Sequence, residues 1–360
     1  MTDVHTIRAI LDLARWAPSG DNTQPWRFEI VSPAHVVVHG FDTRTHCVYD
    51  LDGHSSQIAI GALLESIRIA ATGYGVSAAV ARRGDTPDTQ PTFDVRFEPA
   101  SVTRSELINY LQVRSVQRRP LRTRRLTEAE KTSLEASVGP RYRVVWLEGL
   151  RQRWRVARLL WRNAGLRLTI PEAYEVHRAI IEWRARFSED RIPEQALGAN
   201  WLTARLMQFG MKRWSRIAFM NRWFGGTIAP RIELDLIPSL VCAAHFLVAA
   251  DSRCHSLGDY VDAGAAMQRL WLTATSLRLQ IQPEMTPLIF ARYAAEGRQF
   301  SKVAAAQQAA MEIAGRLERL FGPEAGRAAF MGRIGAGPAP KARSLRRPLE
   351  QLLVRRSGHL

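Results

Sequence analysis

The hydrophobic and polar positions of the first hundred residues predict an alternation of helices and strands. Apolar residues recur at helical spacing in two stretches, and shorter apolar or alternating runs between and after them predict strands. The predicted elements are, in order, a helix over 4–16, strands over 28–31 and 36–39, a buried helix over 56–72 and a strand over 93–97.

A second cycle of similar elements begins near residue 126. Thr127 and Glu130 have the spacing of a capping box and predict the start of a helix. The remaining predicted elements are a strand over 142–147, Arg- and Trp-rich helices over 150–224, a central strand over 239–250 and a buried helix over 261–279. From 332 to 348, glycines and prolines exclude a helix and predict an extended tail that carries arginines.

The two buried helices share a register of small residues. With Gly61 set on Gly264, the Gly-Ala pairs that begin at these positions coincide, and so do the Ala-Thr pairs at 71–72 and 274–275. Any two core helices share apolar positions, but small residues matched at fixed positions indicate more than periodicity does. We therefore expect an internal duplication.

Composition excludes several classes of protein. The 360 residues, 46% of them hydrophobic, can fill the core of one large or two ordinary domains. The N-terminus has no basic stretch before an apolar one, and no 18-residue window is wholly apolar, so neither a signal peptide nor a membrane span is expected. Three widely spaced cysteines, Cys47, Cys242 and Cys254, argue against a disulfide framework and predict a reducing, cytoplasmic location.

The formal net charge of +16 favours contact with an anion. Almost all basic residues are arginines, a skew that genome composition can produce, and no nucleic-acid-binding motif accompanies them, so no nucleic-acid partner is expected. Metal and serine-hydrolase chemistry are not expected either. The nine histidines lack metal-ligand spacing, and the sequence contains no Gly-x-Ser-x-Gly elbow.

The segment 17–26, Ala-Pro-Ser-Gly-Asp-Asn-Thr-Gln-Pro-Trp, carries the densest set of candidate binding groups. It lies between a predicted helix and a predicted strand. Its amide side chains can give directed hydrogen bonds to a planar heterocycle, and Trp26 can pack beneath the site. An elaborate turn uses the same residue types, so the spacing alone leaves both interpretations open.

This segment resembles the flavin loop of the nitroreductase-like FMN-dependent flavoproteins. Three further segments resemble that family's Arg-Ser opening, its central dimer-core helix and its basic C-terminal strand exit; they are 114–121, 262–270 and 346–350. The loop occurs only in the first half of the chain and the Arg-Ser opening only ahead of the second. This order is similar to that of the single-chain, pseudo-dimeric branch of the family, the Acg-type and MoeY-type proteins.

The resemblance implies a nitroreductase-like α+β fold in which two half-domains form an intrachain pseudo-dimer, with central mixed sheets flanked by helices. The half-domains would be 1–103 and 104–360, the second with a helical insertion at about 150–230 and the extended tail. One FMN site would lie at their junction. The residues implied at this site are Pro18, Ser19, Asn22, Gln24, Arg114, Ser115, Arg118, Glu284, Met285, Arg346 and Arg347.

The implied roles follow residue chemistry. Arg114, Arg346 and Arg347 would contact the FMN phosphate, and Ser115 would donate to the phosphate or the ring. The alternatives are solvated surface charges for the arginines and a helix cap for Ser115.

The amides of Asn22 and Gln24 would contact the polar edge of the ring, or else stabilise the turn. Glu284 and Met285 stand where most relatives carry small residues, which departs from the family pattern.

The implied activity is hydride transfer from NAD(P)H through the flavin to an unidentified organic acceptor: a nitro compound, a quinone or a biosynthetic intermediate. The flavin carries the reaction, so no catalytic side chain is nominated. The alternatives are a flavin-binding protein without turnover, closed by residues 150–230, and, less favoured, a basic nucleic-acid-binding protein. The expected state is a monomer or a weak homodimer.

Residues 206–224 interleave basic residues with Met, Trp and Phe. Three interpretations are open for this stretch. It is a lid over the flavin, a helix that makes peripheral contact with a membrane surface, or a helix that packs its aromatic side and solvates its charges.

Overall fold

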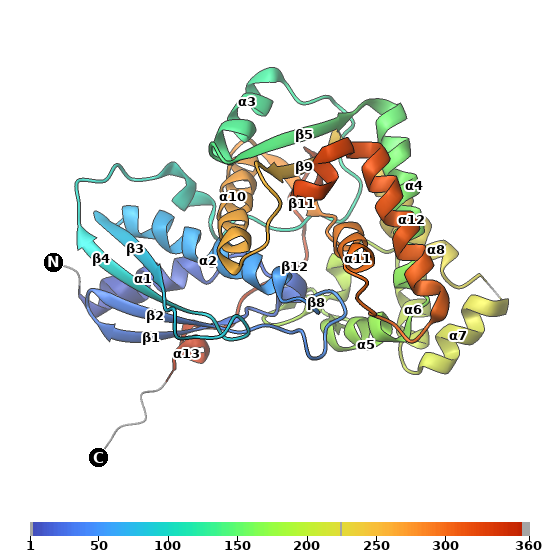
Figure 1. The fold of residues 1–360 in the computed structure, drawn as a ribbon, viewed down its shortest axis with the longest axis horizontal. Coiled ribbons are helices and arrows are strands. Elements are labelled where there is room, and N and C mark those ends of the chain that lie inside the picture. Colours follow the sequence, from blue (N-terminus) through green and yellow to red (C-terminus); the bar gives the residue numbers. More distant parts are fainter. Residues whose placement is uncertain (1–2, 224, 355–360) are drawn as a thin grey trace, which may run out of the picture.

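The computed structural model describes residues 3–223 and 225–354 (Figure 1). Its first half is an antiparallel sheet of four strands in the order β1-β2-β4-β3, with two helices packed on it. The elements are α1 (Val4–Ala14), β1 (Trp26–Ser32), β2 (His35–Gly40), α2 (His54–Thr72), β3 (Val76–Arg82) and β4 (Thr92–Pro99). Apolar residues on one face of α1 and along α2 bury against this sheet.

The second half repeats this plan. Its core elements are α3 (Glu128–Ser137), β5 (Tyr142–Glu148), β9 (Ala244–Ala250), α10 (Leu257–Ser276), β10 (Leu279–Pro283) and β11 (Ala328–Ala336). The sheet order is β5-β9-β11-β10, again antiparallel throughout. Position by position, β5, β9, β11 and β10 therefore correspond to β1, β2, β4 and β3 of the first sheet. The capping box predicted at Thr127 and Glu130 starts α3 and is confirmed.

The central helices α2 and α10 pack on each other through their glycines. A Cβ on Gly61 would collide with the backbone carbonyl of Val261, and a Cβ on Gly264 would collide with that of Ile58. With Gly61 set on Gly264, Ile58 corresponds to Val261, so the two close approaches are equivalent to each other. Only glycine permits backbones to come this near.

Polar pairs between the same helices follow the same correspondence. The Gln268 amide donates to the Ser66 hydroxyl at 2.9 Å, and Arg269 lies 3.2 Å from the Glu65 carboxylate. Glu65 corresponds to Gln268 and Ser66 to Arg269. The contact between α2 and α10 is thus reciprocal over two turns of helix.

The second half carries two helical insertions. One lies between β5 and β9 and the other between β10 and β11, and both pack on the face of the second sheet that looks away from α10. Their helices are α4 (Gly149–Arg167), α5 (Pro171–Ile180), α6 (Trp201–Gly210), α7 (Trp214–Trp223), α8 (Ile228–Pro230), the π-helical turn η4 (Arg231–Leu236), α9 (Ile237–Leu240), α11 (Thr286–Ala295) and α12 (Ala304–Phe321). This second core explains why every residue of β9 is buried.

Two segments cross between the halves, each pairing with the edge of one central sheet. After the short helix η2 (Glu106–Tyr110), the chain runs along the second sheet, where Val116 pairs with Ile281 at the edge of β10. The tail after β11 returns to the first half through α13 (Leu349–Leu352), and Leu353 pairs with Phe28 at the edge of β1. These bridges are parallel, whereas the two central sheets are antiparallel rather than mixed.

Several sequence predictions need correction. Residues 181–200 are not helical: they form the two-residue strands β6 (Ile181–Glu182), β7 (Phe187–Ser188) and β8 (Ile192–Pro193) and a 3-10 turn. The apolar run at 239–250 is a strand only from Ala244, because residues up to Leu240 belong to the turn of helix α9, with Pro238 in its first positions. Residues 332–336 belong to an interior strand, β11, and the extended tail starts after it, where β12 (Arg343–Ser344) pairs with β7. The sequence patterns also missed β3, β10, α11 and α12.

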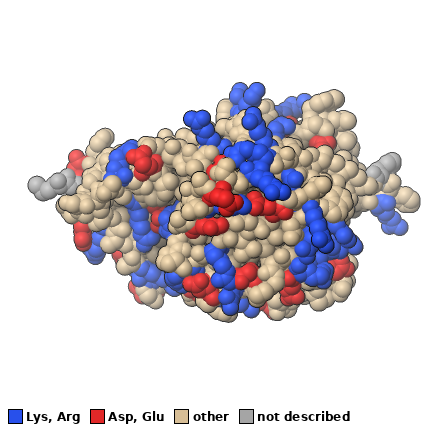
Figure 2. Space-filling model, turned by 90° about the horizontal axis from the view of Figure 1, so that it is seen from above, with Lys and Arg blue, Asp and Glu red and all other residues tan. Residues whose placement is uncertain are grey.

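The surface mixes charges of both signs. On the face shown in Figure 2, basic side chains gather in clusters, with a group of acidic side chains between them. Among the described helices, none is long and apolar enough to cross a membrane.

Candidate functional site

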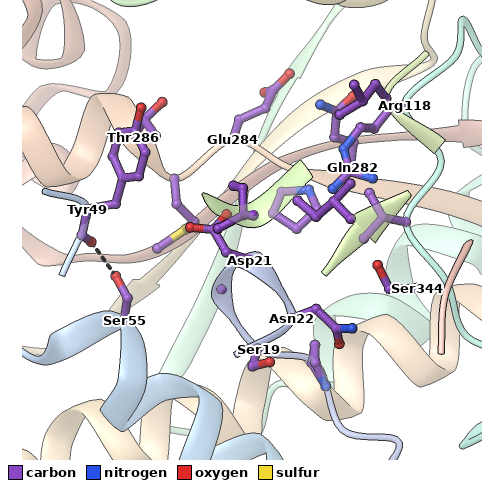
Figure 3. A pocket seen from close by; sticks show the side chains of 18 of the residues that line it. Ser19, Asp21, Asn22, Tyr49, Ser55, Arg118, Gln282, Glu284, Thr286 and Ser344 are labelled. Carbon is purple, nitrogen blue, oxygen red and sulfur yellow. Dashed lines mark hydrogen bonds between the residues drawn. The ribbon is translucent and has the colours of Figure 1, made fainter. Parts of the chain in front are cut away.

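A cavity of about 400 Å³ lies where the two halves, the insertions and the tail meet. This volume is within the range of small-molecule sites. The loop before β1 reaches the cavity from one side, while Gln282 and Glu284 reach it from another (Figure 3). The sequence-predicted residues that line it are Pro18, Ser19, Asn22, Arg114, Ser115, Arg118, Glu284, Met285 and Arg346.

The loop between α1 and β1 has a strained backbone. Asp21, Asn22 and Gln24 have positive φ angles of 52°, 62° and 50°. This left-handed conformation costs free energy for residues other than glycine and is best tolerated by Asn and Asp. The Ser19 hydroxyl accepts a hydrogen bond from the Gln24 backbone N–H at 3.0 Å. The loop is therefore held in a fixed shape that faces Asp21 and Asn22 into the cavity.

The two amide side chains of the loop bind other parts of the protein. Asn22 Nδ2 donates to the Glu189 carbonyl at 3.1 Å, and Asn22 Oδ1 accepts from the Arg346 guanidinium at 2.8 Å. Gln24, which is fully buried, donates to the Glu189 carbonyl at 2.9 Å and accepts from the Arg347 backbone N–H at 2.9 Å. Both amides thus tie the loop to the insertion and the tail, and Gln24 is outside the cavity lining.

Three guanidinium groups converge on one wall of the cavity, and within the described residues none of them has a carboxylate partner. They belong to Arg114, Arg343 and Arg346. Burial lowers the pKa of all three; the charges of Arg346 and Arg343 lower that of Arg114 further, and those of Arg343 and Arg15 help to bring that of Arg346 to about 9. Buried like charges disfavour one another, so this wall needs an anion.

The protein satisfies Arg114 and Arg343 only in part, whereas Arg346 donates to the Ala17 carbonyl at 2.9 Å and to Asn22 Oδ1 at 2.8 Å. Arg114 donates to the Trp16 carbonyl at 3.2 Å and lies over the ring of Trp271, with 4.5 Å between the guanidinium carbon and the ring centroid. Arg343 donates to the Gln112 carbonyl at 2.7 Å. The Nε atoms of Arg114 and Arg343 are buried without a hydrogen-bond partner. These two donors are available to an acceptor group bound in the cavity.

The remaining residues of the Arg-Ser segment line the cavity beside this wall. Arg118 donates to the Ala196 carbonyl at 3.2 Å, and burial, partly offset by Asp21, lowers its pKa to about 10. Ser115 also borders the cavity. The segment therefore supplies two cationic groups and a hydroxyl from the start of the second half.

Glu284 and Met285 follow β10 and are anchored by the sheet. The Glu284 backbone N–H donates to the Met331 carbonyl at 2.8 Å, and its carboxylate lies 2.8 Å from His245 Nδ1. Burial disfavours a charged His245, but Glu284 outweighs this effect and raises the pKa of the ring to about 10. The two buried side chains are therefore held against each other at the cavity edge.

The wall built by the insertion is polar and paired. The Tyr49 hydroxyl lies 2.9 Å from His177 Nε2, and burial together with the charge of Arg167 lowers the pKa of His177 to about 3. The neutral ring and the Tyr49 hydroxyl therefore share a hydrogen bond. Arg167 contacts both carboxylate oxygens of Asp235, at 3.1 and 3.2 Å.

Asp21 differs from its neighbours because no hydrogen bond or ion pair of its carboxylate was found among the described residues. Burial, opposed by Arg118 and reinforced by Asp50, raises its pKa to about 6. In Figure 3 it lies between Tyr49 on one side and Arg118 on the other. It is a carboxyl group able to change protonation near neutral pH inside the cavity.

Arg347 is not part of the cavity lining. Its guanidinium lies 3.1 Å from the Asp190 carboxylate, and its backbone N–H serves Gln24. Trp26 is fully buried in the main core, as its predicted packing role requires.

Sequence patterns missed several groups that line the cavity. These are Asp21, Tyr49, Arg167, His177, Asp235, Arg333, Arg343 and Ser344. Arg343 and Ser344 lie three and two residues before Arg346. The basic sequence of the tail could therefore have identified them as candidate site residues. Within the described residues there is no cluster of His, Cys, Asp or Glu suited to a metal ion.

Comparisons with known proteins add a distant similarity. No protein-family model matches the chain. It is 24% identical over 292 residues, 80% of its length, to the uncharacterized protein MT1398 of Mycobacterium tuberculosis strain CDC 1551, and the match spans 40% of that protein. The chain thus covers less than half the length of this relative.

Three solved structures are similar in part. A nitroreductase-like family protein of Bacillus cereus has 12% identity over 72% of this chain and all of its own, with a TM-score of 0.35. An FMN-bound nitroreductase of Bacteroides fragilis has 9% identity over 71% of this chain and 97% of its own, with a TM-score of 0.37. The FMN-dependent nitroreductase NfnB of Mycobacterium smegmatis, in complex with NADPH, has 13% identity over 68% of this chain and 96% of its own, with a TM-score of 0.35. At these values the case for a function rests on the residues of the cavity.

Proposed function

We propose that the cavity binds FMN and that the chain is an FMN-dependent oxidoreductase, which passes hydride from NAD(P)H to an organic acceptor. One observation carries the proposal. The buried Arg114 and Arg346 and the half-buried Arg343 form a cationic wall without a carboxylate partner in the described chain, beside the loop that resembles a flavin loop. A phosphate dianion is the group that such a wall fits.

A bound phosphate would offset the repulsion among the three guanidinium groups of this wall. Each guanidinium presents several donors in a fixed fork, and the free Nε atoms of Arg114 and Arg343 supply donors that the protein leaves unused. Asn22 would act as a positioning residue, since its carbonyl oxygen holds Arg346 at 2.8 Å. Gln24 would hold the tail in place in the same way through the Arg347 backbone.

The rest of the lining would orient the flavin ring and exclude water. We assign Pro18, Ser19, Ser115, Glu284 and Met285 to this part of the site, because they border the cavity outside the arginine wall. When bound, FMN supplies the two-electron chemistry, and the protein supplies orientation and electrostatics. Asp21 and Arg118 provide an ionisable acid and a cation beside that space.

The same proposal includes a pseudo-dimer of two half-domains, 1–103 and 104–360. The matching sheet orders and the reciprocal contacts of Gly61 and Gly264 support it. The flavin loop comes from the first half and the Arg-Ser segment from the second, so one site per chain follows.

The visible spectrum of the purified full-length protein tests this proposal. We expect flavin absorbance, FMN as the compound released on denaturation, and one FMN per chain after saturation. A protein that neither carries FMN nor binds it when added would contradict the proposal. Two tightly bound FMN per chain would contradict the composite site while leaving flavin binding intact.

A second candidate is a flavin-binding protein without turnover. The insertion favours it, because Leu160, Met207 and Met211 from α4 and the α6 region close one side of the cavity. Steady-state oxidation of NADH or NADPH with a quinone or nitroarene acceptor separates the two. A flavin that is bound but never oxidises either nicotinamide would favour the second candidate.

A further inference from the structure

We propose that the surface formed by residues 201–223, the α6–α7 hairpin, docks on a membrane bilayer that carries anionic lipids. The evidence is the orientation of α6, the charge of the hairpin and the position of α6 beside the cavity.

Helix α6 turns its apolar face outward. Trp201, Leu202, Leu206 and Phe209 are 77%, 52%, 47% and 53% exposed. At 100° per residue these positions form one stripe, and Arg205 lies within it. The buried side of the helix carries small residues, including Thr203 and Ala204. A helix on an ordinary soluble surface has the opposite arrangement.

The hairpin carries positive charge alone. Residues 201–232 contain no Asp or Glu, whereas Arg205, Lys212, Arg213 and Arg222 are exposed. None of these four forms an ion pair within residues 3–223 and 225–354. Trp and Leu side chains on a helix whose charges are all basic are typical of helices that lie in the interface of anionic membranes.

Complementarity selects the bilayer over a second copy of the chain. A two-fold contact through this face would bring the same cations of both copies together, which opposes association. An anionic bilayer offers both an apolar layer for Trp201, Leu202, Leu206 and Phe209 and a counter-charge for the basic groups. The exposed stripe needs both.

Docking at this face would bring the bilayer close to the cavity. Met207, on α6, and Met211, directly after it, line the cavity. The bilayer and the cavity would then be separated by about one helix diameter, roughly 10 Å.

Vesicle flotation of the full-length protein tests the proposal. We expect partition onto phosphatidylcholine vesicles that contain about a third phosphatidylglycerol, little binding to pure phosphatidylcholine, and release as salt is raised. The variant Leu202→Ser/Leu206→Ser should lower partition at least about tenfold, because it removes apolar contact. Both side chains are exposed, so the fold should be unaffected.

A matched variant controls for general hydrophobicity. Leu150→Ser/Met311→Ser removes two side chains of similar exposure, 67% and 48%, on α4 and α12, and should leave partition unchanged. Lys212→Gln/Arg213→Gln should weaken binding to anionic vesicles by about tenfold, on the basis of roughly 1 kcal/mol for each cation.

Three outcomes would overturn the proposal. The first is no binding to anionic vesicles, and the second is an equal loss of partition in Leu202→Ser/Leu206→Ser and in the control Leu150→Ser/Met311→Ser. The third is a concentration-dependent dimer that Leu202→Ser/Leu206→Ser abolishes. The last would identify the face as an interface between copies. Flavin content is measured in parallel, because membrane docking does not depend on the proposed flavin.

Discussion

The two halves of the molecule share one plan and differ in what connects its elements. In the first half, β1 and β2 are joined by a two-residue turn, and β3 and β4 by residues 83–91. In the second half, the equivalent connections are residues 149–243 and 284–327. The sheets and the central helices therefore carry the fold, whereas the unequal connections build the second core and much of the cavity.

The halves also differ at the entry to the first strand. Residues 15–25 form the strained loop before β1, but only residues 138–141 separate α3 from β5. The second half therefore has no equivalent of the loop, and the pairing of α2 with α10 is symmetric while the cavity is not. One half therefore supplies the loop and the other the cationic segment that line the same cavity.

The largest expected effect comes from separating the halves. The fragments 1–103 and 104–360 should each be poorly soluble and colourless alone, because each would expose one face of a central helix at about 25 cal/mol per Å² of apolar surface. Co-expression should restore a yellow complex. The check is solubility and flavin absorbance of each fragment and of the pair.

The tail makes this test specific. In the fragment 104–360 the segment around Leu353 loses its pairing with Phe28, and Arg346 loses Asn22. A fragment 104–360 that bound FMN with near-native affinity would show that the first half takes no part in the site.

The next effect concerns the helix contact. Gly61→Ala and Gly264→Ala each place a Cβ against a backbone carbonyl of the other helix, so each should lower the free energy of unfolding by about 3 kcal/mol, a cost at the upper end of overpacking. Gly315→Ala on α12 is the matched control: its Cβ would have room, and removing a glycine from a helix stabilises by roughly 0.5–1 kcal/mol. Denaturant unfolding measures all three. A large cost at only one of the two central glycines would break the equivalence of the halves.

The central helices and the loop could be predicted from the sequence. Gly61 and Gly264 could be aligned because close packing leaves only small residues at the contact, and the loop could be recognised because its polar residues are dense. The two-residue strands within 181–200 could not be predicted, because such short strands have no periodicity. Arg343 went unnoticed in an arginine-rich chain, since its place on the cavity wall beside Arg114 and Arg346, not its residue type, distinguishes it.

The third effect concerns the cationic wall that only the composite site possesses. Arg114→Ala should weaken FMN binding by about ten- to a hundredfold and riboflavin binding much less, because a charge-assisted hydrogen bond contributes roughly 1.5–3 kcal/mol. Arg119→Ala, an exposed position of the same segment, should change neither affinity. Fluorescence titration of the apoprotein with both ligands measures this. Equal losses for FMN and riboflavin would move Arg114 away from the phosphate.

The smallest effect concerns Asp21, which belongs to the loop that the second half lacks. Its pKa is raised from 3.8 to about 6, so the folded state binds this proton more tightly than the unfolded state. Stability should therefore fall as the pH rises from about 4 to about 6 and stay level above that range. The shift corresponds to at most about 3 kcal/mol, and water in the cavity should reduce it to about 1 kcal/mol.

Asp21→Asn removes this titration while keeping the left-handed backbone that Asn tolerates. Below about pH 4 the variant and the parent apoprotein should unfold alike, because the aspartic acid is then protonated in both of its states. Above pH 6 the variant should be more stable by the amount above, which thermal unfolding across this pH range measures. Asp85 is an exposed carboxylate on the β3–β4 connection, so Asp85→Asn should not change how stability depends on pH in this range. If Asp21→Asn were destabilising at every pH, its carboxylate would be holding the loop together, and the acid would not be a free group of the cavity. Equal stability below about pH 4 with a more stable variant above pH 6 would instead show that the first half keeps a destabilising carboxyl group in the loop that the second half lacks.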